Sequence, residues 1–223
     1  MRFTLSSSAL SNKLSILSKV INSKNSLSIL DSFLFEVRGG QLILTASDNA
    51  NMMKCYVALS DYEGEGAFCI PNRIIQAAVK ELPEQPLTFE VSSPENSVKI
   101  VYQNGSYRVA GQNAEEYPYL QPIDSNATEI SLPAGTLAAN IQRTMFATAN
   151  DELRMVMNGL YFDLREDSLN IVASDGHKMV RNMIYSCKTA NPASFILPKK
   201  PAGLLRSVLD LNDEEEVSIR FNN

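Results

Sequence analysis

Ile171-Val172-Ala173-Ser174-Asp175-Gly176-His177-Lys178-Met179 follows an alternating apolar run and contains the only histidine of the chain. An earlier stretch, Leu44-Thr45-Ala46-Ser47-Asp48-Asn49, carries the same Ala-Ser-Asp core 127 residues upstream. The first question is therefore whether the whole chain is an internal duplication.

The spacing of 127 residues holds well beyond these three residues. Beyond Leu82 it predicts one inserted residue, so that Phe89 and Val91 match Val217 and Ile219 at a spacing of 128. One spacing kept over so long a stretch indicates two copies of one unit. The matched pairs include Phe3 and Ile130, Leu10 and Leu137, Leu14 and Ile141, Phe35 and Phe162, Leu42 and Leu169, Ile70 and Leu197, and Leu82 and Leu209.

Hydrophobic periodicity predicts the same order of elements in both units. In the first unit, Ser6 to Ser8 are suited to cap a helix, and Gly39-Gly40 and Asn104-Gly105 are hairpin signals. Its predicted helices cover 8–22 and 72–82, the second with Ile74, Ile75, Ala78, Val79 and Leu82 on its apolar side, and its strands cover 2–5, 30–38, 41–47, 52–60, 66–69, 87–91, 98–102 and 107–110. The second unit is predicted to have helices at 135–148 and 201–209 and strands from 129, at 157–164, 168–174, up to 186, at 194–197 and at 215–221.

These elements predict an α+β fold of repeated domains, each with two helices packed on antiparallel sheets. We expect a first domain at 1–120, a linker at 121–128 and a second domain at 129–223. The second domain lacks a counterpart of the closing hairpin at 98–110, so an open sheet edge is expected there.

Composition excludes several classes of protein. The 223 residues are 44% hydrophobic and 20% charged, as in globular domains. No apolar run is long enough for a membrane span and the N-terminus does not resemble a signal peptide, so a cytoplasmic protein without a membrane partner is expected. The cysteines, Cys55, Cys69 and Cys187, are widely spaced, which argues against disulfides and against a metal site. No motif for a cofactor is present.

The net charge of −5 hides an uneven distribution. The predicted helical stretches, taken as 8–22, 72–82, 135–148 and 199–209, carry a net +7, whereas the remainder carries −12. Basic helices without interspersed aromatic residues favour the backbone of duplex nucleic acid over stacked single strands. The basic residues of these stretches are Lys13, Lys19, Arg73, Lys80, Arg143, Lys199, Lys200 and Arg206, and Glu81 is the one acid.

Together these features resemble one family. The runs Asn158-Gly159-Leu160-Tyr161-Phe162 and Leu197-Pro198-Lys199-Lys200, the Ala173 to Met179 stretch and the opening Met1-Arg2-Phe3-Thr4 are similar to the bacterial DNA polymerase III beta subunit, the sliding clamp. Ser28-Ile29-Leu30 and Ile70-Pro71-Asn72-Arg73 fit as well, so the resemblance covers essentially the whole sequence.

The resemblance implies a role in DNA replication as a processivity factor. Members of the family have three such domains, and two chains form a ring around double-stranded DNA, without reading its sequence, that tethers the replicative polymerase. It therefore implies that this chain is a clamp shortened at its C-terminus, with the third domain absent, and that the full-length protein is a homodimer. The implied partners are the DNA polymerase III alpha subunit, the clamp loader and other proteins that carry clamp-binding motifs.

Site residues follow from the same resemblance. The implied DNA contacts are Lys24, Arg73, Lys80, Asn150, Arg154, Lys199 and Lys200. The implied wall of a cleft for partner peptides consists of Met157, Ser174, Gly176, His177, Lys178 and Met179. Tyr107 and Val109 would lie on the edge that meets the partner subunit. Because Gly176 to Met179 have no match after Ser47-Asp48, we interpret them as the feature that distinguishes the second unit.

Two other hypotheses concern the function of the chain. Ser174, Asp175 and His177 suggest catalysis, but they are too close along one strand end to form a triad, in which the groups converge from separate segments. The echo at Ser47-Asp48 without histidine favours a structural role for the Ser-Asp pair, and we expect no enzyme activity. The alternative function is a peptide-binding module of the same fold that does not encircle DNA.

Overall fold

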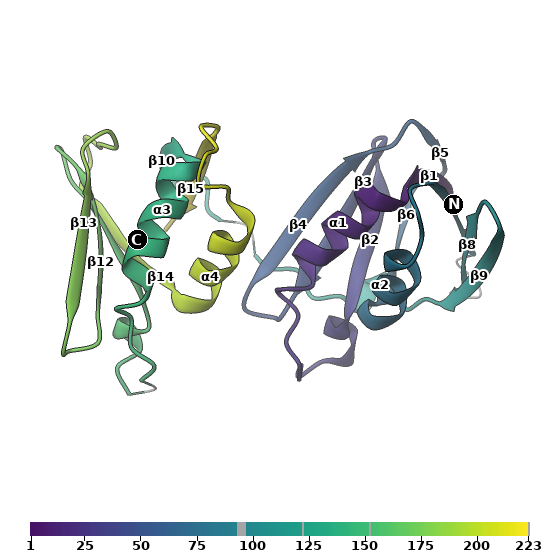
Figure 1. Cartoon of the computed structure of the whole chain (residues 1–223), viewed down its shortest axis with the longest axis horizontal. Helices are drawn as coiled ribbons and strands as arrows, with labels where there is room; N and C mark the ends of the chain where they lie inside the picture. Colours follow the sequence, from purple (N-terminus) through teal and green to yellow (C-terminus); the bar gives the residue numbers. More distant parts are fainter. Residues whose placement is uncertain (93–96, 122, 152, 223) are drawn as a thin grey trace. The chain divides into compact units, whose positions relative to one another are not determined.

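A computed structural model of the chain describes residues 1–92, 97–121, 123–151 and 153–222. Its contacts divide the chain into unit 1, Met1–Leu120, and unit 2, Gln121–Asn223, and each unit is described by itself below (Figure 1). Pro122 of the predicted linker and Asn223 lie outside the described residues.

Unit 1 consists of helices packed on antiparallel strands. Its helices are α1 (Ser7–Leu17) and α2 (Asn72–Lys80), with short 3-10 helices η1 (Ser28–Asp31) and η2 (Ala114–Glu116). Its strands are β1 (Arg2–Ser6), β2 (Ser32–Arg38), β3 (Gln41–Ser47), β4 (Met52–Ala58), β5 (Asp61–Glu63), β6 (Gly66–Pro71), β7 (Pro86–Ser92), β8 (Ser97–Tyr102) and β9 (Gly105–Ala110).

Unit 2 repeats this order. Its helices are α3 (Ala134–Met145) and α4 (Lys199–Val208), with the 3-10 helix η3 (Met155–Met157). Its strands are β10 (Thr128–Pro133), β11 (Gly159–Leu164), β12 (Leu169–Ser174), β13 (Met179–Ile184), β14 (Ala193–Pro198) and β15 (Glu216–Phe221). The α+β class and the antiparallel sheets expected from the sequence are confirmed.

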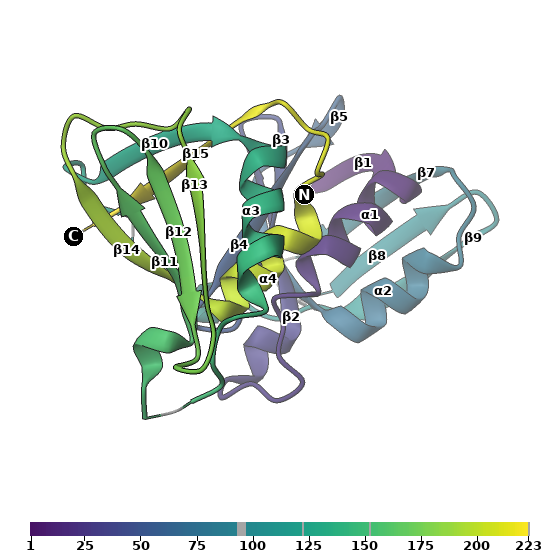
Figure 2. The same ribbon diagram turned by 60° about the vertical axis from the view of Figure 1, so that its left-hand side comes forward.

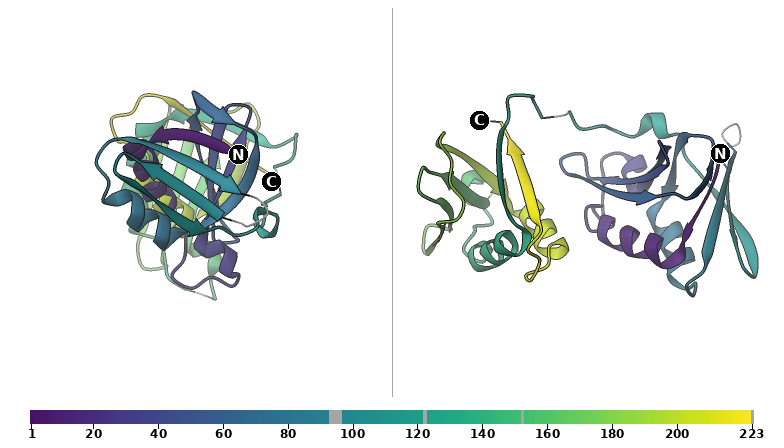
Figure 3. Two further views of the ribbon diagram at one scale, coloured as in Figure 1. Left: turned by 90° about the vertical axis from the view of Figure 1, so that its right-hand side faces the viewer. Right: turned by 90° about the horizontal axis from the view of Figure 1, so that it is seen from above.

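Each unit contains two sheets. Unit 1 has the orders β4-β3-β2-β6 and β5-β1-β7-β8-β9, and unit 2 has β13-β12-β11-β14 and β10-β15. Figure 3 shows the yellow β15 lying alongside β10. Among the described residues β15 pairs with β10 alone, whereas its counterpart β7 lies between β1 and β8.

The two four-stranded sheets share one register. Leu34 lies opposite both Thr45 and Cys69 in unit 1, and Tyr161 lies opposite both Val172 and Ile196 in unit 2. Each residue of the second set follows its counterpart by 127 positions. The internal repeat inferred from the sequence is therefore a repeat of the structure.

The insertion of one residue predicted beyond Leu82 is too short. Leu5 lies opposite Leu87 on β7, and Leu132, its counterpart, lies opposite Val217 on β15. Val217 follows Leu87 by 130 residues, so the connection between α4 and β15 has three extra residues and the predicted spacing of 128 is wrong. Strand alternation has a period of two residues, so both spacings place the same faces inward and the pattern cannot separate them.

Apolar side chains gather between the helices and the sheets of each unit. In unit 1, Phe3 stacks on Phe89 at a centroid distance of 4.9 Å, and Phe35 stacks on Phe68 at 5.1 Å. In unit 2, Phe162 stacks on Phe195 at 4.7 Å. Figure 2 shows α3 and α4 next to each other on one side of the sheet of β11 to β14. The opposite side of each four-stranded sheet is its outer side.

The helices begin and end near their predicted limits. Ser6 Oγ accepts the Ala9 N–H at 3.1 Å, which confirms the predicted cap. α1 ends at Leu17, earlier than predicted, and α4 begins at Lys199, so Pro201 lies in the first turn, where a missing N–H is tolerated.

Three details of the prediction are wrong. The strand runs from 30 and from 157 begin instead with η1 and η3, because a single 3-10 turn is too short to show its own periodicity. Ile74 of the predicted apolar side of α2 is 50% exposed, whereas Ile75 and Val79 of the same predicted side are buried. Ile74 and Ile75 lie about 100° apart around the helix, so only part of the predicted side faces the core.

Candidate functional site

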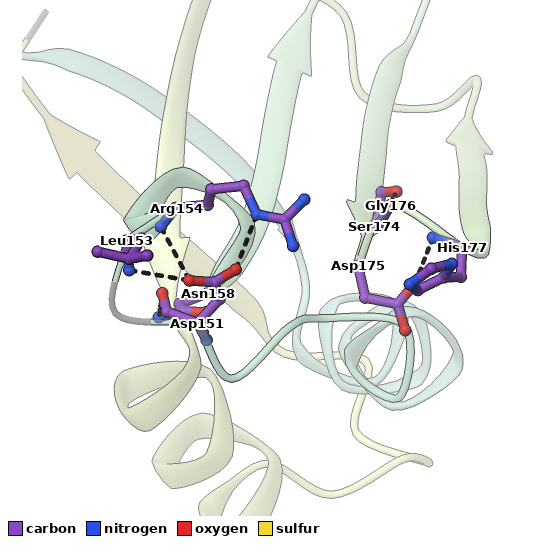
Figure 4. A network of polar contacts seen from close by, with 8 residues as sticks. All are labelled: Asp151, Leu153, Arg154, Asn158, Ser174, Asp175, Gly176 and His177. Carbon is purple, nitrogen blue, oxygen red and sulfur yellow. Dashed lines mark hydrogen bonds and ion pairs between the residues drawn. The ribbon is translucent and has the colours of Figure 1, made fainter.

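The turn between β12 and β13 is held by the side chains of its first two residues. Ser174 Oγ accepts the Gly176 N–H at 3.1 Å and donates to the Lys178 carbonyl at 2.9 Å. Asp175 Oδ1 accepts the N–H groups of His177 and Lys178, both at 2.9 Å (Figure 4). The Lys178 ammonium, which contacts Asp175 Oδ2, and these two amides hold the pKa of Asp175 below its ordinary value. Ser174 and Asp175 therefore shape a turn, in agreement with the structural role predicted for them.

The turn between β3 and β4 has the same construction. Ser47 Oγ accepts the Asn49 N–H at 3.1 Å, and Asp48 Oδ1 accepts the following two N–H groups at 3.0 and 2.6 Å. Asn49 and Gly176 have φ angles of 78° and 89°, so both adopt the left-handed conformation. The conformation of Gly176 does not distinguish unit 2, contrary to expectation, because Asn49 adopts it in unit 1. Unit 2 differs from unit 1 in the side chains that follow this residue of the turn.

A second loop, at 150–158, lies beside this turn. Asp151 and Asn158 join its two ends, since the Asp151 N–H donates to Asn158 Oδ1 at 2.9 Å and Asn158 Nδ2 donates to the Asp151 carbonyl at 2.8 Å. Asp151 Oδ1 accepts the N–H groups of Leu153 at 2.8 Å and Arg154 at 3.2 Å, and Oδ2 accepts Arg154 Nε at 2.7 Å (Figure 4). The Arg154 guanidinium lowers the pKa of Asp151. Asp151 therefore organises the loop around its own carboxylate.

Asn150 and Arg154, which the sequence groups together, have different neighbours. Asn150 Oδ1 accepts Lys199 Nζ at 2.6 Å and so lies at the start of α4. Arg154 Nη1 is 3.3 Å from the point that a Cβ on Gly176 would occupy, so its guanidinium lies over the turn between β12 and β13. Asn150 thus belongs with the basic residues of α4, and Arg154 with the predicted peptide wall.

Apolar side chains surround these two loops. Met157 is half-buried, and Met179, on β13, is 70% exposed. Leu153, Met155 and Val156 are exposed as well. Exposed apolar residues gathered in one place are typical of protein interaction sites. The predicted wall therefore combines Met side chains with the polar turn of Ser174 to Lys178.

Basic residues lie on all four helices. Within the bounds of α1, α2, α3 and α4 no residue is acidic, and Lys19 and Glu81 of the predicted helical stretches fall outside them. Arg73 and Lys80 are exposed on α2, and Lys24 is exposed between α1 and η1. The basic residues within the helices are Lys13, Arg73, Lys80, Arg143, Lys199, Lys200 and Arg206.

The helices of each unit lie side by side. In unit 1, Gln76 Nε2 on α2 donates to the Leu14 carbonyl of α1 at 3.3 Å. In unit 2, a Cβ on Gly203 of α4 would lie 3.4 Å from Met145 of α3. Each unit therefore brings the basic residues of two helices onto one side.

Tyr107 and Val109 lie on β9, the edge strand of the five-stranded sheet. Val109 is buried, and Tyr107 donates its hydroxyl to the Ala78 carbonyl of α2 at 2.8 Å. Both side chains thus point into unit 1, so a partner at this edge would meet the backbone of β9 before these side chains.

Three residues of this region were not singled out from the sequence. Asp151 orders the 150–158 loop, and Tyr161 and Ile196 are exposed apolar residues on the outer side of their sheet. The sequence did contain a signal for Tyr161 and Ile196. They lie 127 positions after Leu34 and Cys69, which are apolar or small residues.

Three further features of the described residues concern metal ligands, thiols and membrane-spanning helices. No group of His, Cys, Asp and Glu there has a geometry suited to a metal ion. The cysteines are free thiols, and burial, with Glu36 and Glu116 nearby, raises the pKa of Cys69 to about 12. No helix in the described part of the chain is long and apolar enough to cross a membrane.

Comparison with known proteins gives one family over both units. Residues 1–121 match the model of the DNA polymerase III beta subunit, N-terminal domain, and residues 131–223 match that of its central domain. The beta sliding clamp of Chlamydia pneumoniae is 30% identical over 81% of this chain and 49% of its own length, and that of Escherichia coli K12 is 28% identical over 100% and 61%. A crystal structure of the Pseudomonas aeruginosa sliding clamp bound to griselimycin has a TM-score of 0.90 and 25% identity over 99% of this chain and 59% of its own. The chain thus spans about half to three-fifths of these relatives.

Proposed function

Because the chain belongs to the DNA polymerase III beta subunit family, we propose that it forms the part of a DNA sliding clamp that contacts duplex DNA and docks replication proteins. The observation that carries this proposal is the pairing of basic, acid-free helices with an exposed apolar wall on unit 2.

The helices supply the DNA contacts. Lys and Arg on regular helices, without acidic neighbours, attract phosphates and carry no base-specific geometry, which suits a protein that must slide. The residues proposed to contact the phosphates are Lys24, Arg73, Lys80, Asn150, Lys199 and Lys200.

The wall supplies the docking site. Met side chains adapt to different ligands, and Gly176 adds no side chain of its own to the turn. We assign Arg154 to this wall because its guanidinium lies over Gly176. The wall is then made of Arg154, Met157, Ser174, Gly176, His177, Lys178 and Met179.

The assembly follows from the family. A ring of two full-length chains around duplex DNA would use the β9 edge near Tyr107 and Val109, and its partners would be the DNA polymerase III alpha subunit, the clamp loader and other proteins with clamp-binding motifs. The proposed role is to tether the polymerase for processive DNA synthesis, without chemistry of its own, and the side chains of Ser174 and Asp175 are engaged in a turn.

A salt titration tests the DNA contacts. Binding of the 223-residue chain to a fluorescent duplex is measured between about 25 and 200 mM salt, the range in which phosphate contacts dominate. Reversing Arg73, Lys199 and Lys200 to Glu should reduce the slope of log K against log[salt] by about 2 to 3, at roughly 0.9 per lost contact.

The matched control reverses Arg38, Lys54 and Lys188, which are exposed and lie outside the helices. This control changes the net charge equally and should leave most of the slope intact. Equal losses in the two variants would mean that net charge, and not the helices, governs binding. An unchanged slope in the helix variant would favour the alternative, a peptide-binding module that does not encircle DNA.

A further inference from the structure

One aromatic side chain lies among the basic residues of the helices, contrary to the prediction from the sequence. Phe146 is the C-cap residue of α3, and its side chain is 65% exposed. The other phenylalanines of the chain are buried or, in the case of Phe195, half-buried in ring contacts within unit 2. The sequence hid this difference, because a Phe at the end of an amphipathic helix is as readily assigned to the core as to the surface. Packing in the core therefore does not explain Phe146.

Phe146 lies on the same side of α3 as Arg143. The two residues are three positions apart, and the backbone of Phe146 is still helical, with φ −66° and ψ −18°, so their side chains are neighbours on the helix surface. Gln142, four positions before Phe146, is exposed as well. The other side of α3 carries its buried residues, which include Leu137, Ala138, Ile141 and Thr144.

The start of α4 adds positive charge next to the last turn of α3. A Cβ on Gly203 would lie 3.4 Å from Met145, so α4 packs beside this turn. Lys199 opens α4, and its Nζ donates at 2.6 Å to Oδ1 of Asn150, four residues beyond Phe146. Because Asn150 is neutral, this contact does not cancel the charge of Lys199. Neither α3 nor α4 contains an acid, so the surroundings of Phe146 on the helices are basic.

The place that Phe146 occupies is a surface in both units. Phe146 follows Lys19 by 127 positions. Lys19 is exposed, although unit 1 includes β8, β9 and the segment at 111–120, which follows β9. The same side of the helix pair thus presents a cation in unit 1 and an aromatic ring beside cations in unit 2. This combination suits a ligand that has both phosphates and bases.

An exposed ring beside cations favours unpaired bases over a duplex. The face of an aromatic ring binds a base by stacking, and neighbouring Lys and Arg hold the phosphates. In a duplex the base faces are already stacked on one another, so a ring could reach them only by separating two base pairs. An unpaired base offers its face without that cost.

We propose that Phe146, together with Arg143 and Lys199, binds single-stranded DNA. One base stacks on the Phe146 ring, and the adjoining phosphates pair with the two cations. The site shares Lys199 with the proposed duplex contacts, so it engages the unpaired strand next to the end of a duplex. The inference rests on the proposed function only in taking this side of the helices to face DNA.

Two oligonucleotides separate the contribution of the bases from that of the phosphates. Fluorescein-labelled oligothymidine of about 12 nucleotides, a common length for single-strand sites, is titrated with the 223-residue chain and followed by anisotropy. An oligonucleotide of the same length built from abasic sites keeps the phosphates, and it should bind at least about fivefold more weakly. Phe146→Ala should bind both oligonucleotides alike, and its affinity for a duplex should stay within about twofold of that of the native chain.

A fluorescent ring at the same place gives a second readout. The chain contains no tryptophan, so Phe146→Trp introduces a single one. Oligothymidine should quench its fluorescence and the abasic oligonucleotide should not, because quenching requires a stacked base. The matched control is Tyr185→Trp, on a tyrosine that is 64% exposed and lies outside the helices, and its fluorescence should not change. If Phe146→Ala fails to fold, as judged by circular dichroism, the abasic comparison and Phe146→Trp still decide the question.

The inference is overturned if the native chain binds the two oligonucleotides equally, which would assign the exposed ring to a protein interface instead. It is also overturned if oligothymidine shows no saturable binding up to about 1 mM, or if Phe146→Trp responds no more than Tyr185→Trp. The outcome is separable from that of the proposed function. Phe146→Ala should leave the salt slope of duplex binding unchanged, so the stacking site can fail while the duplex contacts stand.

Discussion

Leu34 and Tyr161 occupy the same place in two copies of one sheet, and their neighbours on both adjacent strands stand at equivalent positions. Leu34 is fully buried and Tyr161 is 41% exposed. The sheet itself is common to both, so the difference comes from the segment at 111–120, which covers unit 1. The same place in the sheet is therefore buried in unit 1 and exposed in the described part of unit 2.

The largest expected effect comes from removing the cover. Tyr117→Ala should lower the free energy of unfolding of unit 1 by about 3–5 kcal/mol, because it leaves a cavity where a fully buried ring was. Tyr161→Ala in unit 2 should cost less than about 1 kcal/mol, since its ring is already half in water. Urea titrations followed by circular dichroism measure both. Similar losses of stability for the two variants would refute the contrast between the buried position of Tyr117 in unit 1 and the exposed position of Tyr161 in unit 2.

A second pair of substitutions compares the two 3-10 turns. Leu30 in η1 is buried completely, and its counterpart Met157 in η3 is half-buried. Leu30→Ala should cost about 2–4 kcal/mol and Met157→Ala about 1 kcal/mol or less, in the same urea titrations. A larger loss for Met157→Ala than for Leu30→Ala would show that Met157 belongs to the core of unit 2.

The two Ser-Asp turns sharpen the comparison further. Gly176→Val should cost about 1–3 kcal/mol, because a β-branched residue is strained at a φ of 89°. Gly176→Asn should cost less than about 1 kcal/mol, because Asn49 holds the same conformation in unit 1. Thermal melting of both variants is the test. A penalty for Asn as large as that for Val would mean that the two turns are not equivalent.

The smallest expected effect is a change of thermal stability at low pH. The Lys178 ammonium and the amides of Lys178 and His177 lower the pKa of Asp175 in the folded chain. A lowered folded pKa stabilises the fold above the unfolded value of about 3.9, and this contribution is lost as the pH falls from there toward the folded value. Asp175→Asn should therefore melt below the wild type at pH 7 and approach it below about pH 4. A difference that grows as the pH falls would contradict the assignment.

Much of this contrast could be predicted from local pattern. The repeat, the helices and the Ser-Asp turns follow from spacing and turn chemistry, which act over a few residues. The segment that covers the sheet of unit 1 could not be predicted in this way, because Gln112 and Tyr117 lie outside the repeated part. They pack with Cys69 and Leu30, which are far away in sequence. The length of the insertion before β15 was also hidden, since alternation is the same at 128 and 130.

The site was predictable only in part. The resemblance to the clamp family named Met157 and the Ser174 to Met179 turn, but the pairing of Arg154 with Gly176 depends on how Asp151 folds the 150–158 loop. Tyr161 and Ile196 are ordinary strand residues in sequence. In the described part of unit 2 both are exposed, whereas their counterparts Leu34 and Cys69 are buried in one cluster with Tyr117.

Hydrogen exchange of two amides tests the central claim most directly. The Cys69 N–H donates to the Gln112 carbonyl at 3.0 Å, whereas the Ile196 N–H lies at the free edge of β14. In the 223-residue chain, the Cys69 amide should exchange at least about a hundredfold more slowly than the Ile196 amide. Equal protection of the two amides would contradict a covered sheet in unit 1 and an exposed one in the described part of unit 2.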